Sequence, residues 1–580
     1  MRMPQSGPLK LAILAGGDSP ATCATVVALT QLPEAQVVGV VLDTGRISLK
    51  TRLHRMGRSI RREGWSYLAF RIGMALADHL ERLAMHVASE DEVAALFARA
   101  FPGEALNLKR LCTQHKIAIH SVDSLNGSSA VEILRSLRVD LGIVLGTRIS
   151  KRATFFVPRL GCLEMHLGKG PESRSTPPGF WELYDGESTA RITLHLVDEG
   201  LDTGDVVATE TVPVDRGDTP ETLRRRLETR GRELLVRCVA DFAQRRVAPR
   251  AQPTSRRSVR MPPTRRERND LERRFQTSRG RQAPWVKTVK TAWYLLLYYA
   301  GPFHLVRALR RLRGGSRACV LVYHRVNDLG DDPLTTRVRG FVEHMVLLHK
   351  YYKVIPSAAL VEQMAAGQSF PSNTVAIHFD DCYRDIFTHA KPVLTALKFP
   401  ASAFVSSGFV GTKRQFPHDE RSPWVFENLH KRDVCELATS GFEVGSHTVN
   451  HVDLAQCDDE TVFAELLESK RDLEEVVGRP VTLFSLPFGQ EANTRAGVEE
   501  LVRKAGYRAM FSAYGGYVTC ASHLFDLRRI SVSGDARPID LLMEIEGLSL
   551  GAFRRSWRAR RLRQEPVQSV LGTADTNIAN

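Results

Sequence analysis

The sequence predicts an α/β protein made of two separate units, and three observations support this. Apolar runs of strand length recur along both halves of the 580-residue chain, with helix-length segments between them. Polar or charged residues directly follow many of these runs. An arginine-rich stretch separates the two halves. We therefore divide the chain into a unit at 1–245, a basic linker at 246–315, a unit at 316–550 and a disordered basic tail at 551–580.

The composition is that of a soluble globular protein, with 43% hydrophobic and 25% charged residues. The net charge of +15 indicates anionic partners, but the excess of basic residues lies mostly in the linker and the tail. Nine scattered cysteines without a CxxC pair favour a reducing compartment. The first apolar run, Leu11–Ala15, is too short for a signal peptide. We therefore expect a cytoplasmic protein, peripheral at the inner membrane face if its linker binds lipid.

The first unit begins with two predicted strands, Leu9–Ala15 and Val37–Leu42, with a predicted helix at Ala21–Leu32 between them. Strand–helix–strand alternation predicts a parallel sheet with right-handed crossovers. The other expected elements are a mostly helical insertion at 46–100, a buried strand at 139–145 and a closing amphipathic helix at 219–244.

The linker contains many arginines and prolines between 245 and 274 and shows no hydrophobic periodicity, so we expect a solvated segment. Aromatic residues flanked by Lys and Arg follow at 285–313. The apolar part, Ala292–Ala300, is too short to span a bilayer, which needs about 20 apolar residues. Two interpretations stay open: an interfacial helix on an anionic membrane, or a helix packed against the next domain.

The second unit repeats one pattern, in which a short apolar run ends in polar or chemically distinctive residues. Such runs occur at 319–322, 374–379, 401–405, 442–444 and 482–484. Helix-length segments separate the runs. Because the carboxyl ends of parallel strands meet at one face, the pattern predicts an α/β barrel whose active face collects these residues.

Two stretches of this unit suggest a metal site. They are A-I-H-F-D-D-C-Y-R-D at 376–385 and G-S-H-T-V-N-H at 445–451. On a helix or helical turn, the spacing of His447 and His451 would place both imidazoles on one face. Asp381 completes a set of two histidines and one carboxylate, while Asp380 is free to accept a proton from the attacking water. Either stretch alone is more often a surface feature, but both follow buried strands of one unit.

These motifs resemble the polysaccharide deacetylase family over most of 318–535, including the stretch Leu486-Pro487-Phe488-Gly489. The resemblance implies a distorted (β/α) barrel and a hydrolase that cleaves a non-peptide carbon–nitrogen bond. Its substrate would be an acetylated saccharide or a sugar–lipid precursor. The implied roles are a divalent metal, typically zinc, on Asp381, His447 and His451, with Asp380 as the base and the backbone near Pro487 and Phe488 binding the oxyanion.

The second unit also departs from this family's usual pattern. His378 and Cys382 stand where Thr and Gly are common, and the late motif that supplies a general-acid histidine is missing. The opening V-Y-H-R-V at 322–326 resembles the exopolysaccharide-modifying branch of the family. His324 in this stretch is a candidate for the acid, and a structural role is its alternative.

The first unit resembles the formyltransferase family that uses 10-formyltetrahydrofolate, over roughly residues 10–245. The resemblance rests on G-C-L-E-M-H at 161–166, P-P-G-F-W-E-L-Y-D-G-E at 177–187 and T-L-H-L-V-D-E-G-L-D-T-G-D at 193–205. It implies a Rossmann-like fold with His166 and Asp202 as catalytic residues. The family's Asn is Glu164 here, and a carboxylate cannot donate a hydrogen bond unless it is protonated.

Three functional alternatives follow from these patterns. The N-terminal unit could formylate an amino sugar that deacetylation exposes, or it could be an inactive sugar-binding or scaffold domain. A third class is an electrostatic protein that binds nucleic acid or a membrane through its basic segments. The metal constellation favours an enzyme, and without a recognisable RNA-binding barrel we expect no nucleic-acid partner. The sequence does not predict an oligomeric state.

Overall fold

The structure is a computed structural model of the chain. It describes residues 7–45, 57, 66–102, 107–147, 151–167, 177–199, 204–215, 218–251, 262–279, 284–312, 317–329, 332–371, 373–420, 422 and 424–554.

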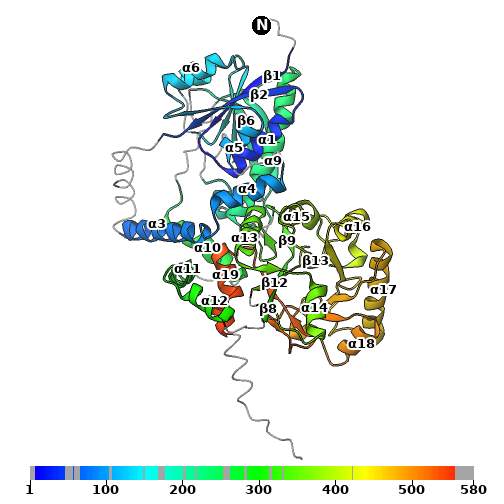
Figure 1. Cartoon of the computed structure of the whole chain (residues 1–580). Coiled ribbons are helices and arrows are strands. Elements are labelled where there is room, and N and C mark those ends of the chain that lie inside the picture. Colours follow the sequence, from blue (N-terminus) through cyan, green and yellow to red (C-terminus); the bar gives the residue numbers. More distant parts are fainter. Residues whose placement is uncertain are drawn as a thin grey trace, which may run out of the picture.

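The N-terminal sheet lies at the upper end of the molecule in Figure 1 and has the strand order β3-β2-β1-β4-β5-β6-β7. The first five strands in this order, from β3 at the edge through β2, β1 and β4 to β5, run parallel to one another. Strands β6 and β7 extend the sheet beyond β5 with antiparallel pairing. The strands are β1 (Leu9–Ala15), β2 (Ala35–Asp43), β3 (Ala118–Val122), β4 (Leu141–Leu145), β5 (Cys162–Leu167), β6 (Thr189–Leu196) and β7 (Val206–Pro213). This arrangement confirms the predicted Rossmann-like parallel sheet.

Helices cover both faces of this sheet. The helices are α1 (Pro20–Thr30), α5 (Leu108–Gln114), α6 (Ser128–Ser136), α7 (Arg152–Phe155), α8 (Phe180–Tyr184) and α9 (Pro220–Ala243). Residues of α1, α5 and α9 are buried in one apolar cluster with Leu11 and Ile13, and residues of α6 and α7 in another with Ala12 and Leu14. Alternate β1 side chains thus enter opposite layers, as a sheet buried on both sides requires.

The C-terminal sheet forms a nearly closed barrel, as the sequence predicts. Its main strands run parallel in the order β8-β12-β13-β14-β15-β16-β18, and β19 returns to pair with β8. These strands are β8 (Arg317–Tyr323), β12 (Thr374–Phe379), β13 (Ala401–Val405), β14 (Phe442–Ser446), β15 (Leu483–Ser485), β16 (Ala509–Ser512), β18 (Leu527–Arg528) and β19 (Ile530–Ser531). Only Arg529 separates β18 from β19, so this residue lies where the barrel closes.

Helices surround the barrel, and short strands pair with its sheet or with each other. The helices are α13 (Val338–Tyr351), α14 (Ser357–Ala365), α15 (Lys391–Leu397), α16 (Lys431–Thr439), α17 (Asp459–Val477), α18 (Val498–Lys504) and α19 (Pro538–Ile545). The short strands are β9 (Arg325–Val326), β10 (Thr335–Thr336), β11 (Lys353–Val354) and β17 (Val518–Thr519). Strands β11 and β17 pair with β12 and β8 of the barrel sheet, and β9 and β10 form a separate parallel pair. The predicted strands at 374–379 and 401–405 coincide with β12 and β13, and the other predicted strands differ from the observed ones by a few residues at their ends.

The helical insertion of the N-terminal half packs into the core of the barrel unit. Helices α3 (Ser66–Met85) and α4 (Glu90–Ala100) supply buried side chains, among them Leu96 and Phe97, to the same apolar cluster as the barrel strands. Helix α4 contacts α13 and α15, and Glu90 accepts a hydrogen bond from Arg339 at 2.6 Å. Figure 1 shows α4 between the sheet above and the barrel below. The insertion therefore joins the two halves through an apolar interface.

We expect Phe97→Ala to destabilise the barrel unit by about 3–5 kcal/mol, because it opens a cavity in this interface. The Phe97 ring is 8% exposed and lies 4.9 Å from the Phe101 ring. Urea denaturation followed by tryptophan fluorescence measures the change. The matched control is Phe156→Ala, because that ring is 60% exposed. Equal, small shifts for both variants would contradict the packing described here.

The linker is more ordered than the sequence predicts. It contains α10 (Arg265–Arg279), α11 (Pro284–Tyr299) and α12 (Pro302–Leu312). The expectation of a solvated segment between 245 and 274 is therefore wrong over the part that α10 covers, whereas α11 and α12 lie where the sequence predicts a helix. Leu271 of α10 is buried against Phe180 and Trp181 of the N-terminal unit. Tyr294 and Phe303 of α11 and α12 are buried in the barrel core. The high charge of this stretch did not indicate that it forms helices. A few buried apolar side chains on each helix are enough to attach it to a neighbouring unit.

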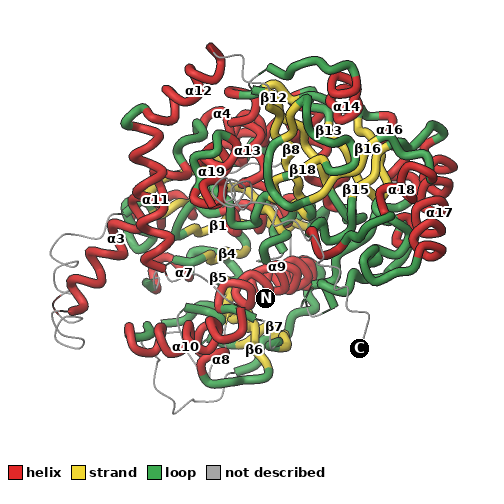
Figure 2. Tube along the Cα trace, turned by 90° about the horizontal axis from the view of Figure 1, so that it is seen from below, coloured by secondary structure: helices red, strands yellow, loops and turns green. Residues whose placement is uncertain are grey.

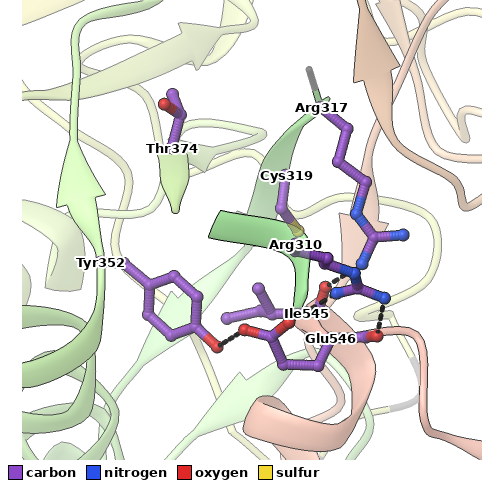
Figure 3. A pocket seen from close by; sticks show the side chains of 7 residues that line it. All are labelled: Arg310, Arg317, Cys319, Tyr352, Thr374, Ile545 and Glu546. Carbon is purple, nitrogen blue, oxygen red and sulfur yellow. Dashed lines mark hydrogen bonds and ion pairs between the residues drawn. The ribbon is translucent and has the colours of Figure 1, made fainter. Parts of the chain in front are cut away.

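A polar cluster at the base of the barrel fixes α12 in place (Figure 3). Glu546, just after α19, accepts hydrogen bonds from Arg310 of α12 and, at 2.8 Å, from the Tyr352 hydroxyl. Arg317 at the start of β8 donates to the Ile545 carbonyl at 2.9 Å. These side chains line a small cavity, and their hydrogen bonds join α12, β8 and the end of α19, so we assign the cluster a structural role.

A buried histidine of α13 makes the barrel sensitive to acid. His344 is fully buried, with Nδ1 3.2 Å from the Tyr323 hydroxyl and Nε2 3.0 Å from the Ala536 carbonyl. Burial lowers its pKa from 6.5 to about 4. As the pH falls, the His344 imidazole takes up a proton in the unfolded chain before it does so in the folded chain. The stability that depends on neutral His344 is therefore fully present above about pH 6.5 and is lost as the pH falls toward about 4. We expect this residue to account for about 3 kcal/mol of that loss.

The variant His344→Gln tests this expectation by urea unfolding at a series of pH values. It should flatten the loss of stability between about pH 6.5 and about pH 4 relative to the natural chain. His523→Gln is the control, because that ring is exposed on the surface. An unchanged pH profile in His344→Gln would contradict the assignment.

In the described part of the chain, no helix combines the length and apolarity needed to cross a membrane. Arg555 and all later residues of the predicted tail lie outside the described residues.

Candidate active site

The candidate active site lies at the carboxyl ends of the barrel strands. Asp380 and Asp381 directly follow β12, His447 follows β14, and Ser485 ends β15. The Asp380 amide donates to the Tyr323 carbonyl at the end of β8 at 3.0 Å, which continues the sheet pairing past the strand. Asp381 then takes a positive φ of 75°, an uncommon conformation for a residue with a side chain. The chain turns at this point and directs the two neighbouring carboxylates to different partners.

Three buried side chains from two segments converge on one point. Asp381 Oδ1 lies 3.3 Å from His451 Nε2 and 3.7 Å from His447 Nε2. One ligand atom from each of the three lies within 4.8 Å of the others. His447 Nδ1 lies 2.8 Å from the Ser485 carbonyl, which can only accept a hydrogen bond. Nδ1 therefore carries the proton, and the lone pair of Nε2 faces Asp381.

The histidine pair lies on a loop and not on a helix, so the expected helical turn is wrong. Thr448 and His451 have positive φ values of 63° and 54°. The carboxylate of Glu465 on α17 accepts hydrogen bonds from the backbone amides of Val449 and Asn450, both at 2.8 Å. This carboxylate replaces the hydrogen bonds that a helix would supply, and the loop brings both imidazoles together without helical spacing.

The protonation of the three side chains fits a divalent cation. Burial lowers the pKa of His447 to about 4, although Asp380 and Asp381 oppose the shift, so the imidazole is neutral at neutral pH. Burial alone would raise the pKa of Asp381, but the hydrogen bond and charge of His451 hold it below its usual range. Among the described residues, Asp381 Oδ2 and His451 Nδ1 have no hydrogen-bond partner. A buried carboxylate beside two imidazoles is a donor set suited to a divalent metal such as zinc.

The second carboxylate, Asp380, is held by a buried arginine. Arg529 donates to both of its oxygens at 2.7 Å, and the Ser485 hydroxyl donates to Oδ2 at 3.2 Å. Burial would raise the pKa of Asp380, but chiefly the charge and hydrogen bonds of Arg529 lower it to about 2. Asp380 is therefore ionised at neutral pH, with its orientation fixed by a bidentate pair.

The side chains around this centre include the residues of the sequence Leu486-Pro487-Phe488-Gly489. Phe488 is 46% exposed, has a positive φ of 59°, and its ring centroid lies 4.6 Å from that of His451. Pro487 is buried. A side chain at Gly489 would collide with Ala513, since an added Cβ would lie 2.5 Å from the Ala513 Cβ. The glycine thus permits the turn that places Phe488 at the rim of the site.

Two further histidines lie close to the centre. His418 Nε2 is 3.7 Å from Asp381 Oδ2 and 2.8 Å from the Tyr383 hydroxyl, and burial lowers its pKa. His324 follows β8, and its charge lowers the pKa of both Asp380 and Asp381. The sequence pattern indicates His324 as a candidate but not His418 or Arg529, which stand alone in stretches without a motif.

The two unusual residues of the first motif belong to the core. His378 is fully buried between the rings of Phe404 and Phe511, and its Nε2 lies 2.7 Å from the Ser357 hydroxyl. Cys382 is also fully buried, and burial raises the pKa of its thiol above the ordinary range. Both departures therefore concern packing beneath the site.

In the N-terminal unit, the candidate residues lie on β5. Glu164 and His166 alternate with Met165, so their side chains share one face of the strand. In the antiparallel register with β6, Glu164 is opposite His195 and His166 is opposite Thr193. Asp202 lies outside the described residues, so its place beside His166 stays a prediction.

Comparisons with known families match both halves of the chain. The family model described as polysaccharide deacetylase matches residues 367–510, which contain Asp380, Asp381, His447 and His451. The model described as formyl transferase matches residues 102–239, which contain Glu164, His166 and Asp202.

Similar curated proteins include methionyl-tRNA formyltransferases. The protein from Pelobacter propionicus is 29% identical over 31% of this chain and 55% of its own length. The protein from Halorhodospira halophila is 32% identical over 25% of this chain and 47% of its own length. The chain thus spans about half the length of these relatives.

Similar solved structures occur for both halves. They include the Streptococcus pyogenes deacetylase PplD in complex with acetate, with 20% identity over 40% of this chain and 98% of that chain at a TM-score of 0.35. IcaB from Ammonifex degensii has 22% identity over 40% of this chain and 98% of that chain at a TM-score of 0.36. Glycinamide ribonucleotide transformylase 1 from Symbiobacterium toebii has 17% identity over 43% of this chain and 96% of that chain at a TM-score of 0.29. The chain combines a polysaccharide deacetylase domain with a formyltransferase-like domain.

Proposed function

We propose that the C-terminal domain is a metal-dependent hydrolase that removes the acetyl group from an N-acetylated saccharide or sugar–lipid precursor. The observation that carries this proposal is the burial of Asp381, His447 and His451 around one point, beside a separately held carboxylate at Asp380. Two adjacent aspartates with different partners can divide the work of metal binding and proton transfer. Zinc suits this donor set.

The residues of the site account for each proton that hydrolysis moves. A metal on Asp381, His447 and His451 would polarise the acyl carbonyl and the attacking water. Asp380 accepts a proton from the water as its oxygen bonds to the carbonyl carbon. The Phe488 backbone at the rim stabilises the charge that develops on the carbonyl oxygen. His324 donates a proton to the nitrogen as the carbon–nitrogen bond breaks, which gives acetate and a free amine.

The experiment is acetate release from N-acetylated oligosaccharides by the full chain, compared with His324→Gln. We expect release of acetate by the natural chain and a loss of about 10²–10⁴-fold in kcat for the variant, the usual effect of removing a general acid or base. His304→Gln is the matched control, because this exposed histidine lies on α12, outside the candidate active site. No acetate release from any N-acetylated saccharide would overturn the proposed function.

The N-terminal domain suggests a second activity, formyl transfer from 10-formyltetrahydrofolate to the amine that deacetylation exposes. The observation that favours it is the match to the formyl transferase family over 102–239, with His166 on β5. In this reaction His166 stabilises the charge on the formyl oxygen while Asp202 assists proton loss from the amine. An inactive sugar-binding or scaffold domain is the competing account.

Glu164 provides the test of this second activity. Glu164→Asn converts an acceptor into a side chain that can donate to an oxyanion, so we expect formylation of an amino sugar to increase. We expect His166→Ala to abolish it. Transfer of a labelled formyl group from 10-formyltetrahydrofolate measures both effects. If neither the natural chain nor Glu164→Asn transfers the label, the domain is a scaffold.

A further inference from the structure

An outer layer of helices on the barrel unit exposes a continuous series of apolar side chains. The layer consists of α3, α11 and α12, together with the segment that follows α19. Figures 1 and 2 both show α11 between α3 and α12, and α11 contacts α3, α12 and α19. The Leu550 amide donates to the Tyr294 hydroxyl at 3.1 Å, which attaches the last segment to α11. We call the solvent-facing side of this layer the outer helical face.

Each helix of this layer has two apolar sides. On α11, Tyr294 and Leu295 are buried in the barrel core, while Trp293 and Leu296 point outward at 46% and 55% exposure. On α12, Phe303 is buried, but Leu305, Leu309 and Leu312 are exposed at spacings of four and three residues. Such spacing places these three leucines in one stripe along the helix. Each helix therefore has a second, solvent-exposed apolar side in addition to the side that packs against the barrel.

This exposure is concentrated and not a general property of the surface. Most of the exposed large apolar side chains in the described part of the chain lie on the outer helical face. The others are Phe156, Val425, Leu467 and Phe488, which belong to separate elements. Soluble proteins rarely expose contiguous apolar patches, and such patches commonly mark binding to another protein or to a membrane.

The chemistry of the face favours a lipid bilayer with anionic headgroups. Helices α11 and α12 contain five lysine and arginine residues and no acidic residue. Four of the five pair with acidic side chains of neighbouring elements: Lys287 with Glu81, Lys290 with Asp540, and Arg307 and Arg310 with Glu546. The chain beyond this face is also basic, with Arg554 exposed and several arginines between 555 and 563. Trp293 and Tyr299 are exposed aromatic residues with a polar tip, which suits the boundary between headgroups and acyl chains. Basic residues beside such a boundary strengthen attraction to anionic lipids.

We propose that the outer helical face binds the surface of an anionic membrane, so that the enzyme works as a peripheral membrane protein. The apolar side chains of α3, α11 and α12 would enter the headgroup region, with the helices parallel to the surface. This inference is independent of the hydrolytic function, because none of these side chains lies in the candidate active site.

The test is sedimentation of the full chain with phosphatidylglycerol-containing vesicles and with pure phosphatidylcholine vesicles, at low and moderate salt. We expect binding to the anionic vesicles that weakens with salt and with loss of anionic lipid. The double variant Leu305→Glu, Leu309→Glu should lower vesicle binding by about tenfold or more. Leu467→Glu is the matched control, because this leucine is similarly exposed on α17.

Analytical ultracentrifugation without lipid tests the rival occupant, a second copy of the chain. We expect no change of mass in the double variant. A dimer that the double variant dissociates would overturn the membrane proposal, and so would a failure to bind either kind of vesicle. Acetate release from a soluble substrate should stay unchanged in the double variant, which shows that the domain remains folded.

Discussion

Asp381→Asn is expected to abolish both metal binding and the proposed deacetylase activity. Asp381 lies within 3.7 Å of both imidazole Nε2 atoms and supplies the only carboxylate of the triad in the described structure. An amide oxygen is a weaker, uncharged ligand, and two buried histidines alone do not balance a divalent cation. We expect metal content to fall below detection after dialysis and kcat to fall by about 10³-fold or more.

Metal analysis of the purified chain and acetate release measure the two effects together. His451→Ala should reproduce both losses, because it removes a second ligand of the same set. Asp459→Asn is the matched control, since Asp459 lies at the start of α17 with an exposed side chain. Retention of metal with full activity in Asp381→Asn would show that the triad is not the metal site.

Asp380→Asn is expected to separate metal binding from catalysis. The residue is not among the three that converge, and its oxygens are engaged by Arg529 and Ser485. An amide cannot accept the proton of the attacking water, so we expect kcat to fall by about 10²–10⁴-fold while metal content stays unchanged. The substitution also leaves the buried Arg529 without its carboxylate, which costs stability.

Because of that cost, the Asp380 test needs a second variant with the same structural defect. Arg529→Gln breaks the same buried pair but retains the carboxylate. If Asp380 is the base, Arg529→Gln keeps far more activity than Asp380→Asn at equal folded fraction, as judged by circular dichroism. Equal losses in the two variants would indicate that the pair acts only in folding.

Much of the deacetylase site was predictable because its key residues form compact motifs. Asp380 with Asp381, and His447 with His451, each lie within a few residues of one another and follow apolar strands. Strand ends of a barrel meet by geometry, so the sequence sufficed to bring the two motifs together. The helical turn expected for the histidine pair was wrong, because Glu465 of a distant helix stabilises a loop with positive φ values.

The supporting residues were not predictable from the sequence. Arg529, Ser485 and His418 come from separate segments, and each is an ordinary residue in its local context. Arg529 is buried beside the Asp380 carboxylate because it lies between β18 and β19, where the barrel closes. No local pattern distinguishes Arg529 from the many other arginines of this basic chain.

The joining of the two halves was also invisible to sequence patterns. Apolar periodicity in the insertion at 46–100 predicts helices with a buried side, but it does not identify the core that buries them. The structure places α4 against α13 and α15 of the barrel unit. The boundaries drawn along the sequence therefore stay a prediction, and contacts across them tie the formyltransferase-like half to the deacetylase half.

Metal content and activity of the natural full chain, before and after chelation, decide whether the candidate site is that of a metal-dependent hydrolase. We expect about one divalent metal per chain, release of acetate from an N-acetylated oligosaccharide, loss of both on chelation, and recovery of both on addition of zinc. A chain that carries no metal and releases acetate equally well with chelator present would contradict the proposed function.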